Sequence, residues 1–553
     1  MKKTLAIMVA LIVVTASIGW SFRVEILLGV IEYRYSSVEV SEPRDIPWQQ
    51  GPSVSTTTNL ERPPNIILIV ADDLGYNDIS TFGGGIVQTP SIDRLAKEGA
   101  VFNQSYSGAS TCAPSRAMMM TGRYPTRTGF EFTPTPAGMA KMVSLVGSDM
   151  DLSLPPAFYD QAMEAKQPPY ELKGLPPGEI TIAETLKDSG YYTAHIGKWH
   201  LGRSNGMSPH EQGFDDSLLM ASALYLPEDD PNTVNAKIPF DPIDKFLWKA
   251  LTYANSFNSG DDDRFKPKGY LTDYWTDESI NVIKANKNRP FFLYLAHWGP
   301  HTPLQATRED YEAVGDIRPH RKRVYAAMVR AIDRSVGRVL DTLDQEGLAD
   351  NTLVMFTSDN GGAGYIGIPE VNQPFRGWKI TMFEGGLRVP MMIKWPSKIT
   401  AGTVVDTPVA HIDVMPTLAA AAATQSKAAE IDGLNLLPLV TSQGDQSWDR
   451  ETLFWQNGHY RVVRHGDWKL QVNDRPTDGL QYWLFDLAKD PTEQNNLAAV
   501  RQDKVNELKG LLVDHQANAV GALYPATTQM PVMVDKTLAE TFEEGDEYVY
   551  TPN

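Results

Sequence analysis

Four separated segments of this chain place charged, amide or imidazole side chains directly after an apolar run of strand length. The runs are residues 65–71, 193–196, 291–296 and 353–357. The side chains that follow them are Asp72, Asp73, Lys198, His200, His297, His301, Asp359 and Asn360. In an open α/β sheet, ligands bind outside the carboxyl ends of the strands, so we expect these groups to share one edge.

Two of these groups, Asp72 with Asp73 and Asp359 with Asn360, offer only oxygen atoms as ligands. Oxygen donors suit calcium or magnesium and suit zinc poorly. Each pair also has a plain interpretation, since the first fits a turn or a helix cap and the second, followed by two glycines, fits a turn. At matching strand ends the pairs together favour a metal site, with the choice between Ca²⁺ and Mg²⁺ open.

The lysine and histidine residues at these strand ends also have ordinary structural interpretations. Lys198 and His200 are two residues apart, so in an extended segment both leave one face, which could equally be a solvated strand face. His301 lies between Pro300 and Pro303, where a hydrogen-bonded histidine in a turn is the alternative. For His297 alone we favour that alternative.

The sequence contains one cysteine, Cys112, so no disulfide can form within the chain. Residues 117–120 are helix formers, and Pro114 fits the first turn of that helix, which would aim its positive end at whatever Cys112 attacks. Arg116 then stands close enough to hold an anion. Either Cys112 is a buried, inert thiol, or its side chain does not remain a thiol.

These groups need a scaffold of alternating strands and helices. Apolar, β-branched runs at 65–71, 290–296 and 352–357 indicate buried strands of a parallel sheet. Helical spacing of apolar residues separates them, at residues 91–98, 181–189 and 321–346. The pattern predicts an α/β fold with a large, mostly parallel central sheet flanked by helices. We interpret the weaker patterns at 132–177 and 225–263 as insertions over the site.

The chain of 553 residues is longer than a usual single domain. We predict a signal peptide or N-terminal anchor, a linker, the large α/β domain, and a C-terminal α+β subdomain with a tail, at residues 1–35, 36–64, 65–446 and 447–553. Aromatic strand-like pieces and a helix near 502–513 predict a small antiparallel sheet with a helix in the last region. The acidic residues 540–547 are expected to be a solvated tail.

The N-terminus has the pattern of an export signal. Lys2 and Lys3 precede an apolar run from residue 5 to about residue 20. Small residues at 15–17 offer a cleavage point, whereas a second apolar stretch at 24–31 also suits an uncleaved membrane anchor. Both interpretations place the body outside the cytoplasm, as a periplasmic, secreted or membrane-anchored protein.

The formal net charge of −18 argues against a nucleic-acid partner, because such proteins usually present a basic face. It does not exclude an anionic substrate. A few convergent cations and a metal ion set the potential inside a cleft, whatever charge the outer surface carries.

Residues 111–123 resemble the signature of the type I sulfatases, in which Cys-X-Pro-Ser-Arg is followed by Thr-Gly-Arg, here Cys112 to Arg116 and Thr121 to Arg123. Lys379, five residues before Glu384, also fits the family pattern. Further matching segments are residues 71–75, 197–202, 300–303, 358–362 and 484–497. The likeness runs from about residue 65 to past residue 500 and implies an alkaline-phosphatase-like fold.

The resemblance implies that a formylglycine-generating enzyme converts Cys112 to formylglycine, whose aldehyde hydrates to a diol. It implies one Ca²⁺ per chain, with ligands from Asp72, Asp73, Asp359, Asn360 and the modified Cys112. Around the sulfate it places Arg116, Lys198, His200, His301 and Lys379. The expected reaction is hydrolysis of an aryl or carbohydrate sulfate monoester through a covalent sulfo-enzyme intermediate. His301, with Lys379, would protonate the leaving alcohol, and His200 would accept the proton that lets the diol collapse.

Two alternatives stay open at this point. Some relatives that share the motif hydrolyse phosphate or phosphonate monoesters. A non-catalytic carbohydrate-binding protein on the same scaffold would instead keep Cys112 as a free thiol. The natural ester and the oligomeric state are not determined by the sequence.

Overall fold

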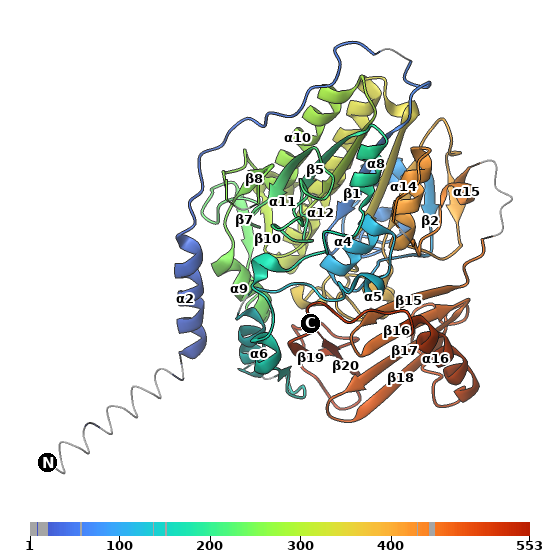
Figure 1. Ribbon diagram of the computed structural model, residues 1–553. Helices are drawn as coiled ribbons and strands as arrows, with labels where there is room; N and C mark the ends of the chain where they lie inside the picture. Colours follow the sequence, from blue (N-terminus) through green and yellow to red (C-terminus); the bar gives the residue numbers. More distant parts are fainter. Residues whose placement is uncertain are drawn as a thin grey trace.

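The computed structural model describes residues 8, 20, 22–55, 58–136, 138–149, 152–260, 262–428, 430–441 and 448–552. Within them, nine strands form one sheet in the order β13-β2-β12-β11-β1-β9-β5-β6-β8 (Figure 1). In that order the strands are Thr403–Val405, Ala100–Phe102, Met391–Lys394, Thr352–Ser358, Asn65–Ala71, Phe291–Ala296, Tyr192–Gly197, Asp216–Met220 and Asn255–Phe257. The five strands from β11 to β6 run parallel, whereas β12 and β8 are antiparallel to their neighbours.

The central strands are apolar throughout because both faces of the sheet are covered by helices. Every residue of β1, β9 and β11 is buried, as expected for parallel strands between two helical layers. One core cluster packs β1 against α3 (Pro90–Lys97), α10 (Leu271–Asn286) and α12 (His320–Gln345). The other packs it against α4 (Cys112–Thr121), α8 (Ile182–Asp188) and α14 (Val414–Ala421). The predicted α/β class and mostly parallel sheet are confirmed.

A four-stranded antiparallel sheet follows in the C-terminal part of the chain, in the order β15-β16-β17-β18 (Figure 1). Its strands are Thr452–Asn457, Tyr460–His465, Trp468–Arg475 and Gly479–Asp486. The helix α16 (Gln502–Gln516) packs on this sheet through Val505, Leu508 and Leu512. The small antiparallel sheet with its helix was predicted from the sequence.

The acidic segment 540–547 differs from the expected free tail. It lies between β19 (Thr528–Met533) and β20 (Tyr548–Pro552), which pair with each other. β19 also pairs with β4 (Phe158–Tyr159). Glu547 in this connection forms an ion pair of 2.5 Å with Arg376. The charges therefore border a strand that returns to the body of the protein.

Three helices lie together at one side of the sheet: α2 (Arg23–Ser36), α6 (Met139–Asp149) and α9 (Pro242–Ala250) (Figure 1). Of the apolar leader run, only residues 8 and 20 are among the described positions. None of the helices in the described ranges is long and apolar enough to cross a membrane. The second apolar stretch, 24–31, lies within α2, and its Val24, Leu27, Leu28 and Ile31 pack on α6 and α9.

Candidate active site

The register of the central strands brings the polar segments to one level at one edge of the sheet. Ala71 of β1 pairs with Ser358 of β11, and Val70 pairs with Ala296 of β9. Backbone hydrogen bonds between neighbouring segments extend one residue beyond the strand ends. Asp359 donates its N–H to the Ala71 carbonyl at 3.1 Å, and Lys198 donates its N–H to the Ala296 carbonyl at 2.9 Å. Side chains that follow these strands are thus neighbours in space.

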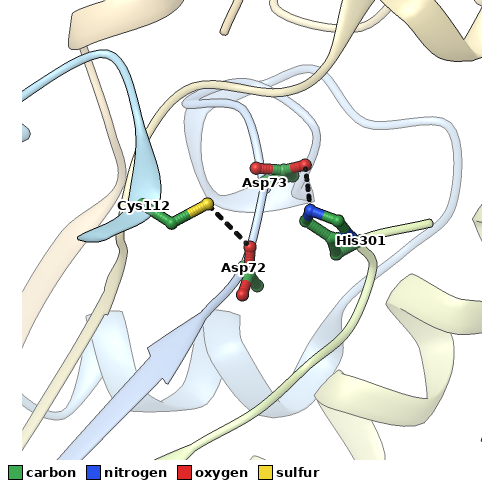
Figure 2. A group of neighbouring side chains, drawn as sticks. All are labelled: Asp72, Asp73, Cys112 and His301. Atoms are coloured by element: carbon green, nitrogen blue, oxygen red, sulfur yellow. Dashed lines mark hydrogen bonds and ion pairs between the residues drawn. The ribbon is translucent and has the colours of Figure 1, made fainter. Parts of the chain in front are cut away.

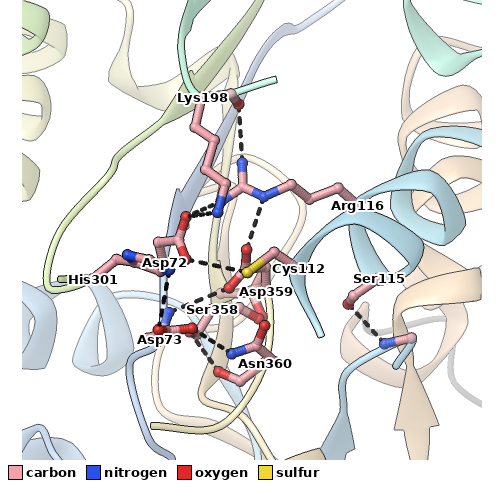
Figure 3. A network of polar contacts seen from close by, with 12 residues as sticks. Asp72, Asp73, Cys112, Ser115, Arg116, Lys198, His301, Ser358, Asp359 and Asn360 are labelled. Atoms are coloured by element: carbon pink, nitrogen blue, oxygen red, sulfur yellow. Dashed lines mark hydrogen bonds and ion pairs between the residues drawn. The ribbon is translucent and has the colours of Figure 1, made fainter. Parts of the chain in front are cut away.

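Arg116 connects three of these segments (Figure 3). Its Nη2 lies 3.0 Å from Asp72 Oδ2, its Nε lies 2.8 Å from Asp359 Oδ2, and Nη1 donates to the Lys198 carbonyl at 3.0 Å. The Lys198 ammonium lies 2.5 Å from Asp72 Oδ2. All four side chains are buried, so each charge depends on its partners for compensation.

Asp73 forms the second half of the cluster. Lys379 Nζ lies 2.7 Å from its Oδ1, and the Asn360 amide donates to the same oxygen at 2.7 Å. His301 Nε2 lies 3.6 Å from Asp73 Oδ2, an approach visible in Figure 2. Tyr365 donates its hydroxyl hydrogen to Asp73 Oδ2 at 2.9 Å. One carboxylate is therefore surrounded by two basic groups, an amide and a phenol.

Cys112 is the first residue of α4 and points at the carboxylates. Its Sγ lies 3.6 Å from Asp72 Oδ1. Four side chains each bring one possible metal-ligand atom to this point, and these atoms all lie within 4.8 Å of one another (Figure 2). The side chains are those of Asp72, Asp73, Cys112 and His301. Burial raises the pKa of the Cys112 thiol to about 12. The unmodified side chain is thus a protonated thiol at neutral pH, and a thiol is a much poorer nucleophile than a thiolate.

The first turn of α4 is fixed from its other side. Ser115 Oγ accepts the Gly108 N–H at 3.0 Å (Figure 3). The same oxygen lies 3.0 Å from His411 Nδ1. At its end the helix stops at Gly122, which has a φ of 67° and so adopts the left-handed conformation that glycine tolerates best. Cys112 and Arg116 consequently leave a helix whose two ends are both held.

Three residues without glycine's freedom adopt left-handed backbone conformations beside the site: Asp73, His200 and Ile380, with φ of 62°, 66° and 71°. Such conformations cost on the order of 1 kcal/mol each and persist only where the surroundings impose them. The Ile380 N–H donates to Ser110 at 2.8 Å, which holds the backbone next to Lys379. The strained backbone positions therefore coincide with, or directly follow, the residues whose side chains face the site.

The oxygen groups fit a hard divalent cation. Asp72, Asp73 and Asp359 converge, and the buried Asn360 Oδ1 has no hydrogen-bond donor among the described residues. Burial and then Asp359 raise the pKa of Asp72 to about 6, although Lys198 and Arg116 oppose the shift. Burial would also raise the pKa of Asp73, but Lys379, His301 and Lys198 lower it below its usual value. Carboxylates crowded in this way, with an orphaned amide oxygen, are the donors that calcium or magnesium binds.

Within the described part of the chain His200 forms no hydrogen bond or ion pair with the carboxylates. It lines the same cavity, of about 290 Å³, as Cys112, Lys198, His301 and Lys379. Burial lowers the pKa of both His200 and His301 well below the usual value, and nearby lysines add to the shift. All ten residues singled out from the sequence are therefore in the cluster or in the wall of its cavity.

Two further residues belong to the site and were not singled out from the sequence. Tyr365 contacts both Asp73 and Lys379, the latter at 3.2 Å. Trp298 stacks on His301 with ring centroids 3.9 Å apart and lies 4.7 Å from the Lys198 ammonium. His297 is instead turned to Ser335, at 2.9 Å, in agreement with the hydrogen-bonded histidine expected at that position.

Comparisons with known proteins agree with this arrangement. A family model described as Sulfatase matches residues 64–424, and one described as N-sulphoglucosamine sulphohydrolase, C-terminal, matches residues 376–518. Human N-acetylgalactosamine-6-sulfatase is 31% identical over 511 residues, covering 85% of this chain and 88% of its own. A sulfatase from Formosa agariphila is 30% identical over 501 residues, covering 81% and 86%.

Solved structures give the same result. The crystal structure of Ps i-CgsB in complex with k-i-k-neocarrahexaose has a TM-score of 0.66 at 29% identity, covering 83% of this chain and 94% of that chain. The family match spans well over half of the sequence and includes the whole strand-end cluster. We conclude that the chain belongs to the type I sulfatase family of the alkaline-phosphatase-like superfamily and is a sulfuric ester hydrolase.

Proposed function

We propose that this enzyme hydrolyses sulfate monoesters with formylglycine made from Cys112. The observation that carries the proposal is the position of Cys112, which starts a helix, faces Asp72 at 3.6 Å and lines a cavity with two lysines and two histidines. A thiol with a pKa of about 12 has no evident use there. The hydrated aldehyde would supply one hydroxyl to attack sulfur and a second whose deprotonation releases sulfate.

Asp72, Asp73, Asp359 and Asn360 would hold Ca²⁺ beside position 112. A bound cation polarises the sulfuryl oxygens and favours an ionised nucleophile. The four ligand side chains come from the ends of only two adjacent strands, β1 and β11, which pair along their full length. Rigid strands of this kind keep the ligand oxygens in place without help from loops.

Three cations would hold the anionic part of the substrate. Arg116 and Lys198 lie on the Asp72 side of Cys112, and Lys379 lies on the Asp73 side. Charges fixed on both sides can hold the ester in line with the nucleophile and offset negative charge on the sulfuryl oxygens in the transition state. Because these cations are already paired with carboxylates, the site is ordered before substrate binds.

The two histidines would move protons. His301 is oriented by its Nδ1, which lies 2.6 Å from the Thr302 carbonyl, and by its stacking on Trp298, so Nε2 is left to face Asp73 and the cavity. From there it would protonate the leaving oxygen, assisted by Lys379. His200, which lines the same cavity, would accept the proton from the side chain at position 112.

Replacement of the nucleophile tests this scheme. A serine attacking sulfur would form a second stable sulfate ester, because it lacks the second hydroxyl. Cys112→Ser, exposed to an aryl sulfate, should therefore gain the mass of one sulfo group and then stop. Peptide mass spectrometry of wild-type protein matured with a formylglycine-generating enzyme should show that position 112 has lost sulfur and two hydrogens and gained one oxygen relative to cysteine. Undiminished steady turnover by Cys112→Ser would refute the scheme.

The same cations would hold a phosphonate monoester, which has a tetrahedral centre like a sulfate ester. A phosphonate monoester hydrolase of Agrobacterium radiobacter shares the fold, with a TM-score of 0.56 at 19% identity. Sulfate and phosphonate esters of one phenol should be compared directly. We expect the larger kcat/KM with the sulfate ester.

We also propose that the protein is exported from the cytoplasm. The support is the pattern of the N-terminus, in which Lys2 and Lys3 precede the apolar run of residues 5–20. Fractionation of cells that produce the full chain, with N-terminal sequencing of the recovered protein, tests both export and removal of the leader.

A further inference from the structure

The helices α2, α6 and α9, which we call the helical cap, form an apolar cluster of their own. Met142, Val143 and Val146 of α6 pack against Phe246 and Ala250 of α9. The α2 helix completes the cluster with Leu27, Leu28 and Ile31, and a 2.8 Å ion pair joins its Glu32 to Lys249 of α9. Figure 1 shows the three helices side by side beyond the edge of the central sheet. This cluster is separate from the two cores that cover the sheet.

One face of α9 forms a wall of the cavity that contains the reactive groups. Five apolar residues at helical spacing make this face: Ile243, Phe246, Leu247, Ala250 and Leu251. The helix is held at its start, where Asp241 accepts the N–H groups of Ile243 and Asp244 at 2.9 and 3.1 Å. The wall is therefore a fixed surface that requires no rearrangement to form.

The wall continues beyond α9. Met139 of α6 and Met530 of β19 line the same cavity. Methionine side chains are flexible and polarisable, so they adapt to apolar ligands of different outline. Basic side chains, Lys173, Arg203 and Arg264, line another part of the cavity.

We propose that the helical cap binds the alcohol part of the substrate and that this part is apolar, an alkylated phenol or a comparable ring system. The inference rests on the proposed sulfate ester hydrolysis. The cavity is continuous from Cys112, Lys198 and His301 to the α9 face, so a sulfate held by the cations places its alcohol against the cap.

The chemistry of this wall discriminates between ester classes. The α9 face presents no side-chain donor or acceptor, and a sugar hydroxyl desolvated against it loses its hydrogen bonds to water. Each such loss weakens binding by on the order of tenfold. An alkyl group gains instead, by about fourfold for each methylene removed from water.

A series of 4-alkylphenyl sulfates, from methyl to hexyl, tests the proposal with enzyme matured at position 112. The acidity of the phenol hardly changes along the series, so differences in kcat/KM report binding of the alkyl chain. We expect kcat/KM to rise about fourfold per methylene until the cavity is filled. A 6-sulfated hexosamine, assayed in parallel, should have a lower kcat/KM than the longer phenyl sulfates.

Leu247→Asn places an amide of similar size in the wall and should flatten the slope of this series. Ile26→Asn is the matched control, because Ile26 belongs to the same cap but is 55% exposed and lies outside the cavity wall. Its slope should equal that of the wild type. Leu247→Met should also keep the slope.

A flat wild-type series, or a sulfated hexosamine with the higher kcat/KM, would overturn the apolar assignment while leaving sulfatase activity in place. A fully matured enzyme that hydrolyses neither class would instead contradict the proposed function. If Leu247→Asn does not fold, the wild-type slope alone decides.

Discussion

Two groups of charged side chains are buried in this protein, and they differ in what surrounds them. The site cluster consists of Asp72, Asp73, Arg116, Lys198, Lys379 and Asp359. The interface cluster consists of Lys469 on β17, Glu384 at the start of α13 (Glu384–Leu387) and Glu493, whose side chains are 0% exposed. Lys469 Nζ lies 3.0 Å from Glu384 and 2.9 Å from Glu493.

Every carboxylate oxygen of the interface cluster has a donor. Glu384 also accepts the Tyr106 hydroxyl at 2.8 Å, and Glu493 accepts the Glu384 N–H at 2.5 Å and the Gln471 amide at 3.3 Å. The site cluster, in contrast, lies beside Asn360 Oδ1, which lacks a donor among the described residues, and opens onto a cavity. Burial of charge does not by itself identify a functional site. The unsatisfied oxygen and the cavity do.

The comparison predicts opposite consequences for the loss of one lysine from each cluster. Lys379→Met removes a cation from the site while keeping the length of the side chain. We expect kcat for an aryl sulfate to fall about a thousandfold, because a charge that stabilises the transition state is lost. The melting temperature should fall less than for the loss of Lys469, because His301, Asn360 and Tyr365 remain around Asp73. A large drop in the melting temperature with near-normal kcat would assign Lys379 to structure instead.

Lys469→Met should have the reverse effect. It leaves two buried carboxylates without their shared cation, so the free energy of unfolding should fall by about 3 kcal/mol. Denaturant titration at neutral pH measures this change. The fraction that remains folded should keep its kcat/KM, since Lys469 forms its ion pairs with Glu384 and Glu493 and not with the carboxylates of the site. A variant that is stable and inactive would remove the distinction between the clusters.

Stabilisation by Ca²⁺ should also distinguish the site cluster from the interface cluster. A ligand at a hundred times its Kd stabilises the folded protein by about 2.7 kcal/mol, so added Ca²⁺ should raise the melting temperature of chelator-treated wild type. Asn360→Ala should lose this shift because it removes one of the proposed ligands. Glu493→Gln should retain it in full. An equal shift in Asn360→Ala would place the ion elsewhere, and a shift with Mg²⁺ alone would change its identity.

The main parts of the fold could be predicted from the sequence because their patterns are long and regular. Continuous apolar runs predicted β1, β9 and β11, and the stripe at 321–346 predicted α12. The face of α9 was not recognised, since five apolar positions after a proline in a short helix resemble an ordinary loop. The β19–β20 pair was missed because the acidic residues between them were interpreted as a tail.

The site could be predicted where residue type and spacing matched a known signature, as for Cys112 and Arg116. Tyr365 could not, because a tyrosine in a loop is most often a packing residue and its contacts to Asp73 and Lys379 depend on tertiary structure. Lys469, Glu384 and Glu493 gave no signal for a similar reason. Single charged residues far apart in the sequence are usually solvated, and only the folded chain shows that these three are paired and buried.

The smallest expected effect concerns the pH dependence of the interface cluster. Burial raises the pKa of Glu493 from 4.5 to about 7, with Glu384 adding to the shift and Lys469 opposing it. A carboxyl with a raised native pKa contributes stability that is full below pH 4.5 and is lost as pH rises toward 7. Relative to Glu493→Gln, the wild type should therefore lose unfolding free energy as the pH rises across this interval.

Asp72, whose pKa is also raised, is present in both proteins and cancels in this difference. For Glu384, burial would raise the pKa, but Lys469, Arg388 and Arg464 lower it below 4.5, so its titration falls outside the interval. Denaturant titrations of both proteins at pH 4.5, 5.5 and 7 give the comparison. A constant difference across these pH values would mean that Glu493 is ionised throughout, so that Lys469 alone faces two charged carboxylates. The site cluster instead matches three aspartates with three cations.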